Sequence, residues 1–129
     1  MKGIRMQGGI PLQGKVRIQG SKNAALPILA ATLLTNEVSY IQNCPRIADV
    51  HRFVHLLREL GCLVHWQEKG IRVQPGENEE LPCERAEARR MQGEAITGMR
   101  SSLCLLGALL GRCGYVTMEH PGGCIFGER

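Results

Sequence analysis

Residues 15–34 read KVRIQGSKNAALPILAATLL, and this stretch decides the fold. Polar and apolar residues alternate over residues 15–20, which predicts a strand with one buried face. Alanine and leucine dominate residues 23–34, which predicts a helix with Pro27 in its first turn, where proline is tolerated. A lysine and an amide therefore stand where the strand gives way to the helix. Because a helix N-terminus attracts anions, the stretch also suggests a phosphate site.

Further strand and helix patterns follow along the chain. Strands are predicted at residues 4–9, 38–43, 62–66, 71–74 and 115–118, and helices at 48–60 and 98–113. Gly61 and Gly114 are typical stops of these two helices. Residues 75–93 are charged without a period and fit a loop, a short helix or a flexible insert equally well. The order β-β-α-β-α-β-β-α-β predicts an α/β fold, with helices against a sheet.

Composition limits the function classes. The chain has 129 residues, of which 43% are hydrophobic, and this suits one domain with its own core. The net charge of +4 comes from dispersed basic residues, and only 4% of residues are aromatic. Nucleic-acid binding usually needs a clustered basic stripe or aromatic platforms, so a small anionic ligand fits better. No apolar run approaches the roughly 20 residues that span a membrane.

The chain has six cysteines: Cys44, Cys62, Cys83, Cys104, Cys113 and Cys124. They form no CxxC pair and no zinc-finger spacing, so neither a metal nor a cofactor is expected. No signal-peptide pattern precedes the predicted fold, which favours reduced thiols in a cytosolic protein. Cys104 and Cys113 follow the apolar pattern of the last helix and should pack as small hydrophobic residues.

Cys124 has a different setting, because it follows Pro121-Gly122-Gly123. Glycines allow backbone conformations that other residues resist, so this loop lets a ligand approach closely and presents the thiol at its tip. The sequence therefore predicts a reactive thiol together with a phosphate site.

Five motifs in order carry a resemblance to the UDP-N-acetylglucosamine 1-carboxyvinyltransferases, which are enolpyruvyl transferases. They are Gly14-x-Val16-x-Ile18-x-Gly20-Ser21-Lys22-Asn23-Ala24-Ala25-Leu26-Pro27, Pro45-x-Ile47-x-Asp49-Val50, Leu56-Leu57-x-x-Leu60-Gly61, Met99-Arg100-x-Ser102 and Pro121-Gly122-Gly123-Cys124-x-x-Gly127-x-Arg129. Each alone is weak, but together they reach almost the whole chain in the family's order.

The resemblance implies a fold of βαβαββ units in the inside-out α/β barrel of the enolpyruvyl transferases. Residues 1–129 would form a single incomplete domain, with helices inside and sheets outside. Residues 1–20 would supply strands that pair with a missing second domain, so residues 1–14 should be mobile or pair with another copy. The shared apolar cluster of the helices should include Leu29, Leu33, Val54, Leu57, Leu105 and Leu109.

The resemblance also implies the chemistry, which is enolpyruvyl transfer from phosphoenolpyruvate to the 3'-hydroxyl of UDP-N-acetylglucosamine. This cytoplasmic reaction begins peptidoglycan precursor synthesis, and fosfomycin targets it. Cys124 would be the general acid, and Lys22 would bind the phosphate of phosphoenolpyruvate. Asn23 and Arg129 would contact both substrates, and Arg100 would bind the charge of the sugar nucleotide.

Plainer interpretations stand beside each of these roles. Cys124 could be an inert buried thiol, Lys22 a solvated lysine and Asn23 an N-capping residue. Arg100 could form a surface salt bridge, and Arg129 could be a disordered terminal residue. The chain as a whole could be a non-catalytic truncated paralogue, or a binding or self-association module. The related enzyme that acts on shikimate phosphate is a third possibility, against which the loop thiol argues. We expect the isolated chain to be inactive.

Overall fold

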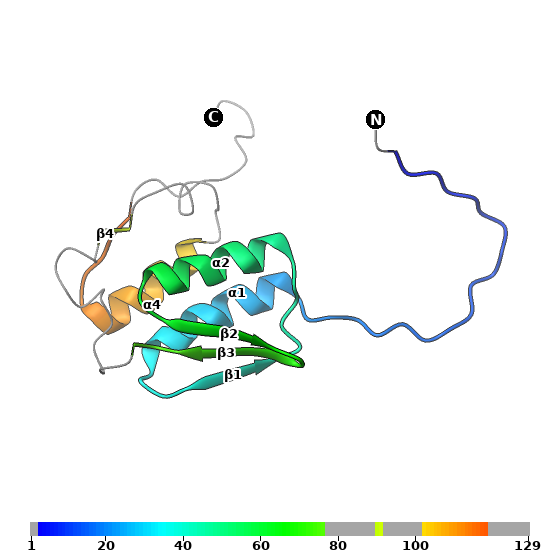
Figure 1. The fold of residues 1–129 in the computed structure, drawn as a ribbon. Helices are drawn as coiled ribbons and strands as arrows, with labels where there is room; N and C mark the ends of the chain where they lie inside the picture. The colour runs from blue at the N-terminus through cyan, green and yellow to red at the C-terminus, as the bar shows by residue number, and fades with distance from the viewer. Residues whose placement is uncertain (1–2, 77–89, 92–101, 119–129) are drawn as a thin grey trace, which may run out of the picture.

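The computed structural model describes residues 3–76, 90–91 and 102–118. The elements in order are α1 (Lys22–Ala31), the 3-10 helix η1 (Thr32–Leu34), β1 (Ser39–Gln42), α2 (Ala48–Glu59), β2 (Leu63–Gln67), β3 (Gly70–Gln74), β4 (Arg90–Met91), α4 (Leu103–Cys113) and β5 (Thr117–Met118). Helices α1, α2 and α4 lie together on one side of the sheet formed by β1, β2 and β3 (Figure 1). This arrangement confirms the predicted mixture of helices packed on a sheet.

The three-stranded sheet has β3 at its centre, antiparallel to both β1 and β2. Ile71 of β3 lies opposite Ile41 on one side and Trp66 on the other, and Val73 lies opposite Val64. Ile71, Val73 and Val64 are buried, while Ile41 and Trp66 pack against the core from its margin. Because strand side chains alternate between faces, these residues give the sheet its apolar face.

The opposite face of the sheet is polar. Arg72 lies between Tyr40 and His65 in the register, and its guanidinium donates to the Tyr40 hydroxyl at 3.4 Å and to the Gln74 amide oxygen at 2.7 Å. One apolar face and one polar face are typical of an antiparallel sheet covered on one side.

The core confirms the predicted apolar cluster of the helices. Each of the six residues is at most 1% exposed: Leu29, Leu33, Val54, Leu57, Leu105 and Leu109. Phe53 is also fully buried and belongs to the same cluster. Residues from α1, α2 and α4 thus share one core with the apolar face of the sheet.

Both predicted glycine stops are confirmed. Gly61 adopts φ 90°, and the amides of Gly61 and Cys62 donate to the carbonyls of Arg58 and Leu57, which is the Schellman arrangement at the end of α2. Gly114 adopts φ 77° after α4, and its amide donates to the Leu110 carbonyl. These positive φ values are costly for residues that carry a Cβ atom.

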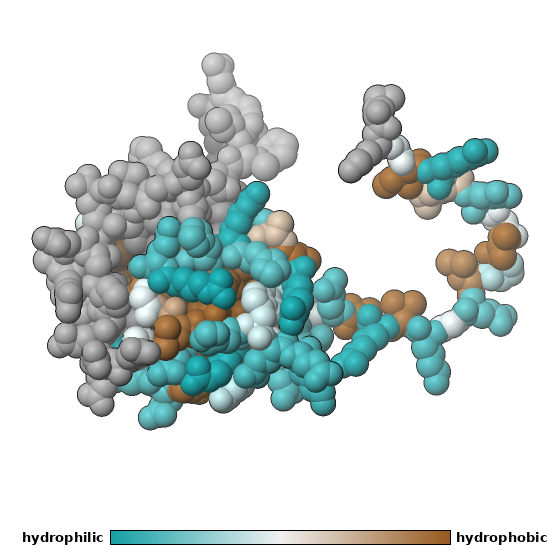
Figure 2. Space-filling view, in the orientation of Figure 1, coloured by the Kyte–Doolittle hydropathy of each residue, from teal (hydrophilic) through white to brown (hydrophobic). Residues whose placement is uncertain are grey.

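The structure assigns no strand to residues 4–9 or 15–20. Their pairing with a further domain stays a prediction. Residues 3–20 run away from the packed helices and sheet as an extended chain (Figure 1). Their alternating apolar side chains are exposed, and Figure 2 shows them in brown along the segment. They are Ile4, Met6, Ile10, Leu12, Val16 and Ile18, which are 75% to 96% exposed. An alternating pattern forms a strand only when a neighbouring strand accepts its hydrogen bonds.

Part of the ambiguous charged segment is a strand. Arg90–Met91 pairs in parallel with Thr117–Met118, although no strand was predicted within residues 75–93. Residues 77–89 of that segment lie outside the described residues, as do residues 98–101 of the predicted last helix. Within the described ranges, no helix is long and apolar enough to cross a membrane.

Candidate functional site

Lys22 and Asn23 occupy the first two positions of α1. The preceding residue, Ser21, is the N-cap, with φ −73° and ψ 134°, and its side chain makes no capping hydrogen bond. The first amide that donates within the helix is that of Ala25, which reaches the Ser21 carbonyl at 2.9 Å. The three amides before it have no acceptor one turn back, and they carry the positive end of the helix dipole. This end of the helix favours a negatively charged group.

Pro27 removes a hydrogen bond from the start of the same helix. It is the sixth residue of α1, so the prediction that it lies in the first turn is wrong. Proline has no amide hydrogen, and the carbonyl of Asn23 therefore lacks its helical donor. The interpretation of Asn23 as an N-capping residue is also wrong, because Ser21 holds that position. Asn23 thus presents a backbone carbonyl without its helical donor as well as a side-chain amide.

The turn after β1 positions the start of α1. Asn43 adopts φ 54°, a left-handed conformation that asparagine tolerates. Its carbonyl accepts from the Gly20 amide at 3.1 Å, and its amide donates to the Lys69 carbonyl at 2.9 Å. A Cβ atom on Gly20 would overlap the Asn43 carbonyl, and one on Gly70 would overlap the Ile41 carbonyl. Two glycines therefore let the β2–β3 turn and the segment before α1 approach the end of β1.

Lys22 forms an ion pair with the start of the next helix. Its ammonium lies 2.8 Å from Oδ2 of Asp49, which is in the first turn of α2. A guanidinium nitrogen of Arg52 lies 3.9 Å from Oδ1 of the same carboxylate. The hydrogen bond from Lys22 is the largest cause that lowers the pKa of Asp49, and the charges of Lys22 and Arg52 add to it. Lys22 is therefore an exposed lysine that also forms an ion pair with Asp49.

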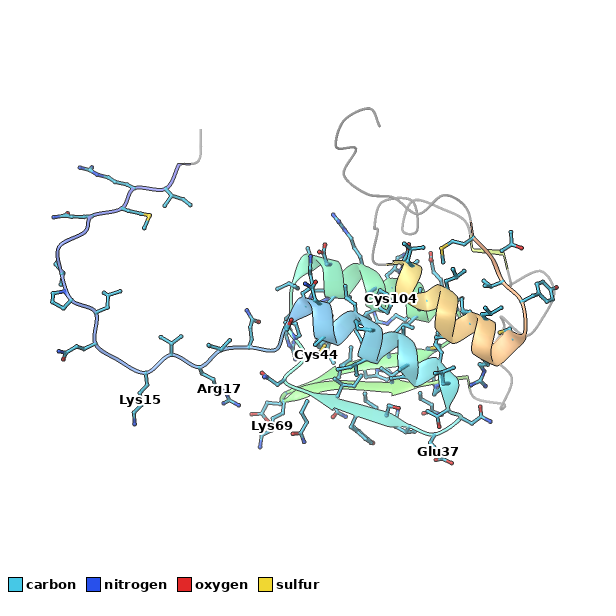
Figure 3. All side chains as sticks on the ribbon, turned by 180° about the vertical axis from the view of Figure 1, so that it is seen from behind. Lys15, Arg17, Glu37, Cys44, Lys69 and Cys104 are labelled. Carbon is cyan, nitrogen blue, oxygen red and sulfur yellow. The ribbon has the colours of Figure 1, made fainter. Side chains whose placement is uncertain are left out.

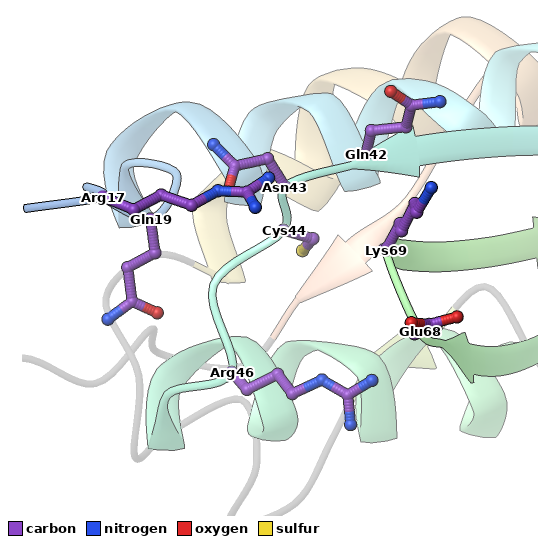
Figure 4. Close-up of a pocket in the computed structure, with 9 residues that line it drawn as sticks. Arg17, Gln19, Gln42, Asn43, Cys44, Arg46, Glu68 and Lys69 are labelled. Carbon is purple, nitrogen blue, oxygen red and sulfur yellow. The ribbon is translucent and has the colours of Figure 1, made fainter.

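A cavity of about 480 Å³ lies beside the turn after β1 (Figure 4). Its lining residues are Arg17, Gln19, Gln42, Asn43, Cys44, Arg46, Glu68, Lys69 and Gly70. Arg46 is held there by a 2.6 Å hydrogen bond to the Gln67 carbonyl and by its position 4.9 Å over the Trp66 ring. The lining carries three cations and one carboxylate, but Lys22 is not part of it.

The described cysteines are free thiols with different burial. Cys44 and Cys62 are buried, and burial raises the pKa of both, that of Cys62 to about 12 despite the nearby charge of Arg112. Cys104 and Cys113 are half-buried and pack against the core, as predicted. Figure 3 shows Cys104 on α4 and Cys44 beside the start of α1. The raised pKa values of Cys44 and Cys62 are the opposite of what an activated thiolate needs.

The remaining predicted site residues, Cys124, Arg100 and Arg129, lie outside the described residues. The structure therefore describes two of the five, Lys22 and Asn23, and brings them to adjacent positions at one helix end. Among the described residues, no group of three histidine, cysteine or acidic side chains is arranged to hold a metal ion.

Two features of this region were missed by the sequence analysis. Asp49 belongs to one of the five motifs, but the motif did not identify it as the partner of Lys22. A sequence signal existed, because α1 and α2 both begin next to the same end of β1, and the first turn of α2 holds one acidic residue. The cavity had no such signal, since its lining comes from three separate segments.

Residues 6–129 match the sequence family described as EPSP synthase (3-phosphoshikimate 1-carboxyvinyltransferase). The chain belongs to the EPSP synthase family. A UDP-N-acetylglucosamine 1-carboxyvinyltransferase of Methylacidiphilum infernorum is 38% identical over 129 residues, and one of Sorangium cellulosum is 43% identical over 129 residues. Each similarity covers 100% of this chain but only 28% and 29% of the relative, respectively. The chain thus spans less than a third of the length of these curated EPSP synthase family relatives.

A solved structure of an enolpyruvyl transferase also resembles the chain. The enolpyruvyl transferase NikO from Streptomyces tendae superposes with a TM-score of 0.65 at 26% identity, over 83% of this chain and 23% of that one. This likeness agrees with the truncated α/β fold predicted from the sequence.

Proposed function

We propose that this chain is the N-terminal part of an enzyme that transfers enolpyruvyl from phosphoenolpyruvate to the 3'-hydroxyl of UDP-N-acetylglucosamine. The observation that carries the proposal is similarity along all 129 residues to proteins named for that reaction. Lys22 and Asn23 support it, because the helix end that they occupy suits a phosphate group. The cysteine of the Pro121–Cys124 loop supports this substrate over shikimate phosphate. On this proposal the protein works in the cytoplasm, in cell-wall synthesis, and is a fosfomycin target.

The reaction is an addition followed by an elimination. The oxygen of the sugar hydroxyl bonds to C2 of phosphoenolpyruvate and releases its proton, while Cys124 donates a proton to C3. Phosphate then leaves from C2, and the proton lost from C3 restores the double bond of the enolpyruvyl ether. Lys22 binds the phosphate throughout, because an ammonium is a compact charge for its oxygens. Arg100 and Arg129 hold the remaining negative charges of the two substrates with planar, bidentate donors.

A chimera tests the proposal. This chain replaces the matching N-terminal segment of the Sorangium cellulosum relative, and phosphate release from the two substrates is measured. We expect the chimera to turn over, and its Cys124→Ser and Lys22→Met forms to lose most of the rate. A chimera that folds and binds neither substrate would overturn the proposal.

The isolated chain should be inactive in the same assay. Water would not be excluded from the site, and groups that a longer relative supplies would be missing. Fosfomycin should accordingly alkylate Cys124 slowly or not at all, which intact-mass measurement checks with Cys124→Ser as control. Turnover by the isolated chain that Cys124→Ser removes would contradict this expectation.

The exposed N-terminal segment favours a second role, in association. Its apolar residues alternate like a strand and are 75% to 96% exposed, so burying them would release a large apolar surface from water. We propose that residues 1–20 pair with a further part of a longer chain or with another copy, as an alternative to catalysis by this chain. Light scattering with and without residues 3–14 tests self-association, and the same monomeric mass for both would exclude it.

A further inference from the structure

Three charged side chains form a row between the starts of α1 and α2. Lys22 contacts one oxygen of Asp49 at 2.8 Å, and Arg52 lies 3.9 Å from the other. The side chains of Lys22 and Asp49 are 44% and 34% exposed. The pair is formed in the folded chain, yet both side chains stay partly exposed to solvent.

The side chain of Asp49 joins the two helices, with a hydrogen bond to Lys22 of α1 and a longer contact with Arg52 of its own helix. The N-cap of α2, Ile47, provides no side-chain capping bond, and the hydrogen bond of the Asp49 side chain goes to Lys22. A carboxylate in the first turn of a helix interacts favourably with the helix dipole in any orientation of its side chain. The dipole alone thus gives no reason for the 2.8 Å contact with a residue 27 positions away.

The contact has a consequence for the ammonium of Lys22. An ammonium carries three N–H donors, and Asp49 accepts one of them, which leaves two for a ligand. A free lysine side chain has many rotamers, and binding must otherwise select one of them. Arg52 offsets part of the negative charge of Asp49, so that the carboxylate repels an incoming anion less.

We propose that Asp49 is a positioning residue that holds Lys22 ready for the phosphate of phosphoenolpyruvate. The inference rests on the proposed function of Lys22 and extends it to a residue that does not itself touch the substrate. It predicts that loss of the Asp49 carboxylate frees the ammonium and weakens anion binding through Lys22.

Competitive acylation of the lysines tests the ion pair without any ligand. An amine must leave its ion pair and lose a proton before it attacks an acylating reagent. Lys15 and Lys69 are exposed and make no ion pair within the described residues, so they serve as internal references in the same tube. Peptide mass spectrometry then gives the reactivity of Lys22 relative to both, which a general change in folding would not alter selectively.

We expect Lys22 of the wild-type chain to react more slowly than the references. Asp49→Asn should raise its relative rate by roughly two- to fivefold, the range of an exposed ion pair. In Asp49→Glu the acylation rate of Lys22 should lie between those of the wild-type chain and Asp49→Asn. Glu59→Gln is the matched control, because it removes one negative charge from the same helix and should leave Lys22 unchanged. An unchanged Lys22 rate in Asp49→Asn would overturn the inference.

The same assay with added phosphoenolpyruvate tests positioning. Phosphoenolpyruvate should protect Lys22 in the wild-type chain, and Asp49→Asn should need a severalfold higher concentration for the same protection. Equal protection in both chains would overturn the role of Asp49 and leave the proposed function of Lys22 intact. No protection of Lys22 in any chain would overturn the proposed binding role of Lys22 itself, and the inference with it.

Discussion

Leu109 and Leu110 are neighbours on α4 and offer a sharp test of the shared helical core. Leu109 is 1% exposed and Leu110 is 51% exposed, so the same truncation to alanine meets opposite surroundings. Leu109→Ala removes three buried carbon atoms, which are worth about 0.8 kcal/mol each in transfer from water. The cavity left behind adds to this, and we expect a loss of about 3 to 4 kcal/mol in the free energy of unfolding.

Leu110→Ala should cost about 1 kcal/mol or less. Half of its side chain is already in water, and alanine is the better helix former. Urea-induced unfolding, followed by far-UV circular dichroism, measures both variants against the wild-type chain, and a common slope against urea shows that the denatured states are comparable. Equal losses in the two variants would refute the placement of α4 on the core.

Three further predictions concern the sheet, the ion pair and a buried thiol. Gly70→Ala should lower the free energy of unfolding by roughly 2 kcal/mol, because the new Cβ atom meets the backbone of β1. Gly107→Ala places its Cβ atom in open space and should stabilise α4 by about 0.5 to 1 kcal/mol, which thermal unfolding measures. The lowered pKa of Asp49 means that its pair with Lys22 stabilises the fold above the unfolded pKa of 3.8 and is lost as pH falls through the folded value. The stability difference between wild-type and Lys22→Met, below about 1 kcal/mol at neutral pH, should therefore vanish in urea titrations at about pH 2. The pKa of Cys62 is raised from 9.0 to about 12, so the folded state keeps the thiol proton to a higher pH than the unfolded state does. The stability of the wild-type chain relative to Cys62→Ala should therefore fall by about 1.4 kcal/mol per pH unit above about 9.

Local patterns were enough to predict the elements that bury their own apolar face. The predicted helix at 48–60 is observed at Ala48–Glu59. The strands predicted at 62–66 and 71–74 are observed at Leu63–Gln67 and Gly70–Gln74. In these segments the periodicity, the glycine stop and the turn agree with one another. The shared core of the helices was expected from the family resemblance, and its six named residues are buried.

The strand predicted at residues 15–20 is not formed in this structure, because alternation describes a side-chain pattern and does not supply a partner strand. The pattern is present in the sequence, but the hydrogen bonds of a strand depend on a second chain segment. The ion pair of Lys22 was missed for a related reason, since it joins residues 27 positions apart. The packing of α1 beside α2 brings their first turns together.

The start of α1 is the least secured turn of that helix. It has no side-chain cap, no acidic residue in its first turn, and a proline in place of one hydrogen-bond donor. Segments with few such supports open locally at a lower free energy than the helix centre, and their amides exchange hydrogen faster. An anion bound at this end would accept hydrogen bonds from amides that otherwise have no partner in the helix. The ligand would then complete the helix, and slower amide exchange at Asn23 would report its arrival.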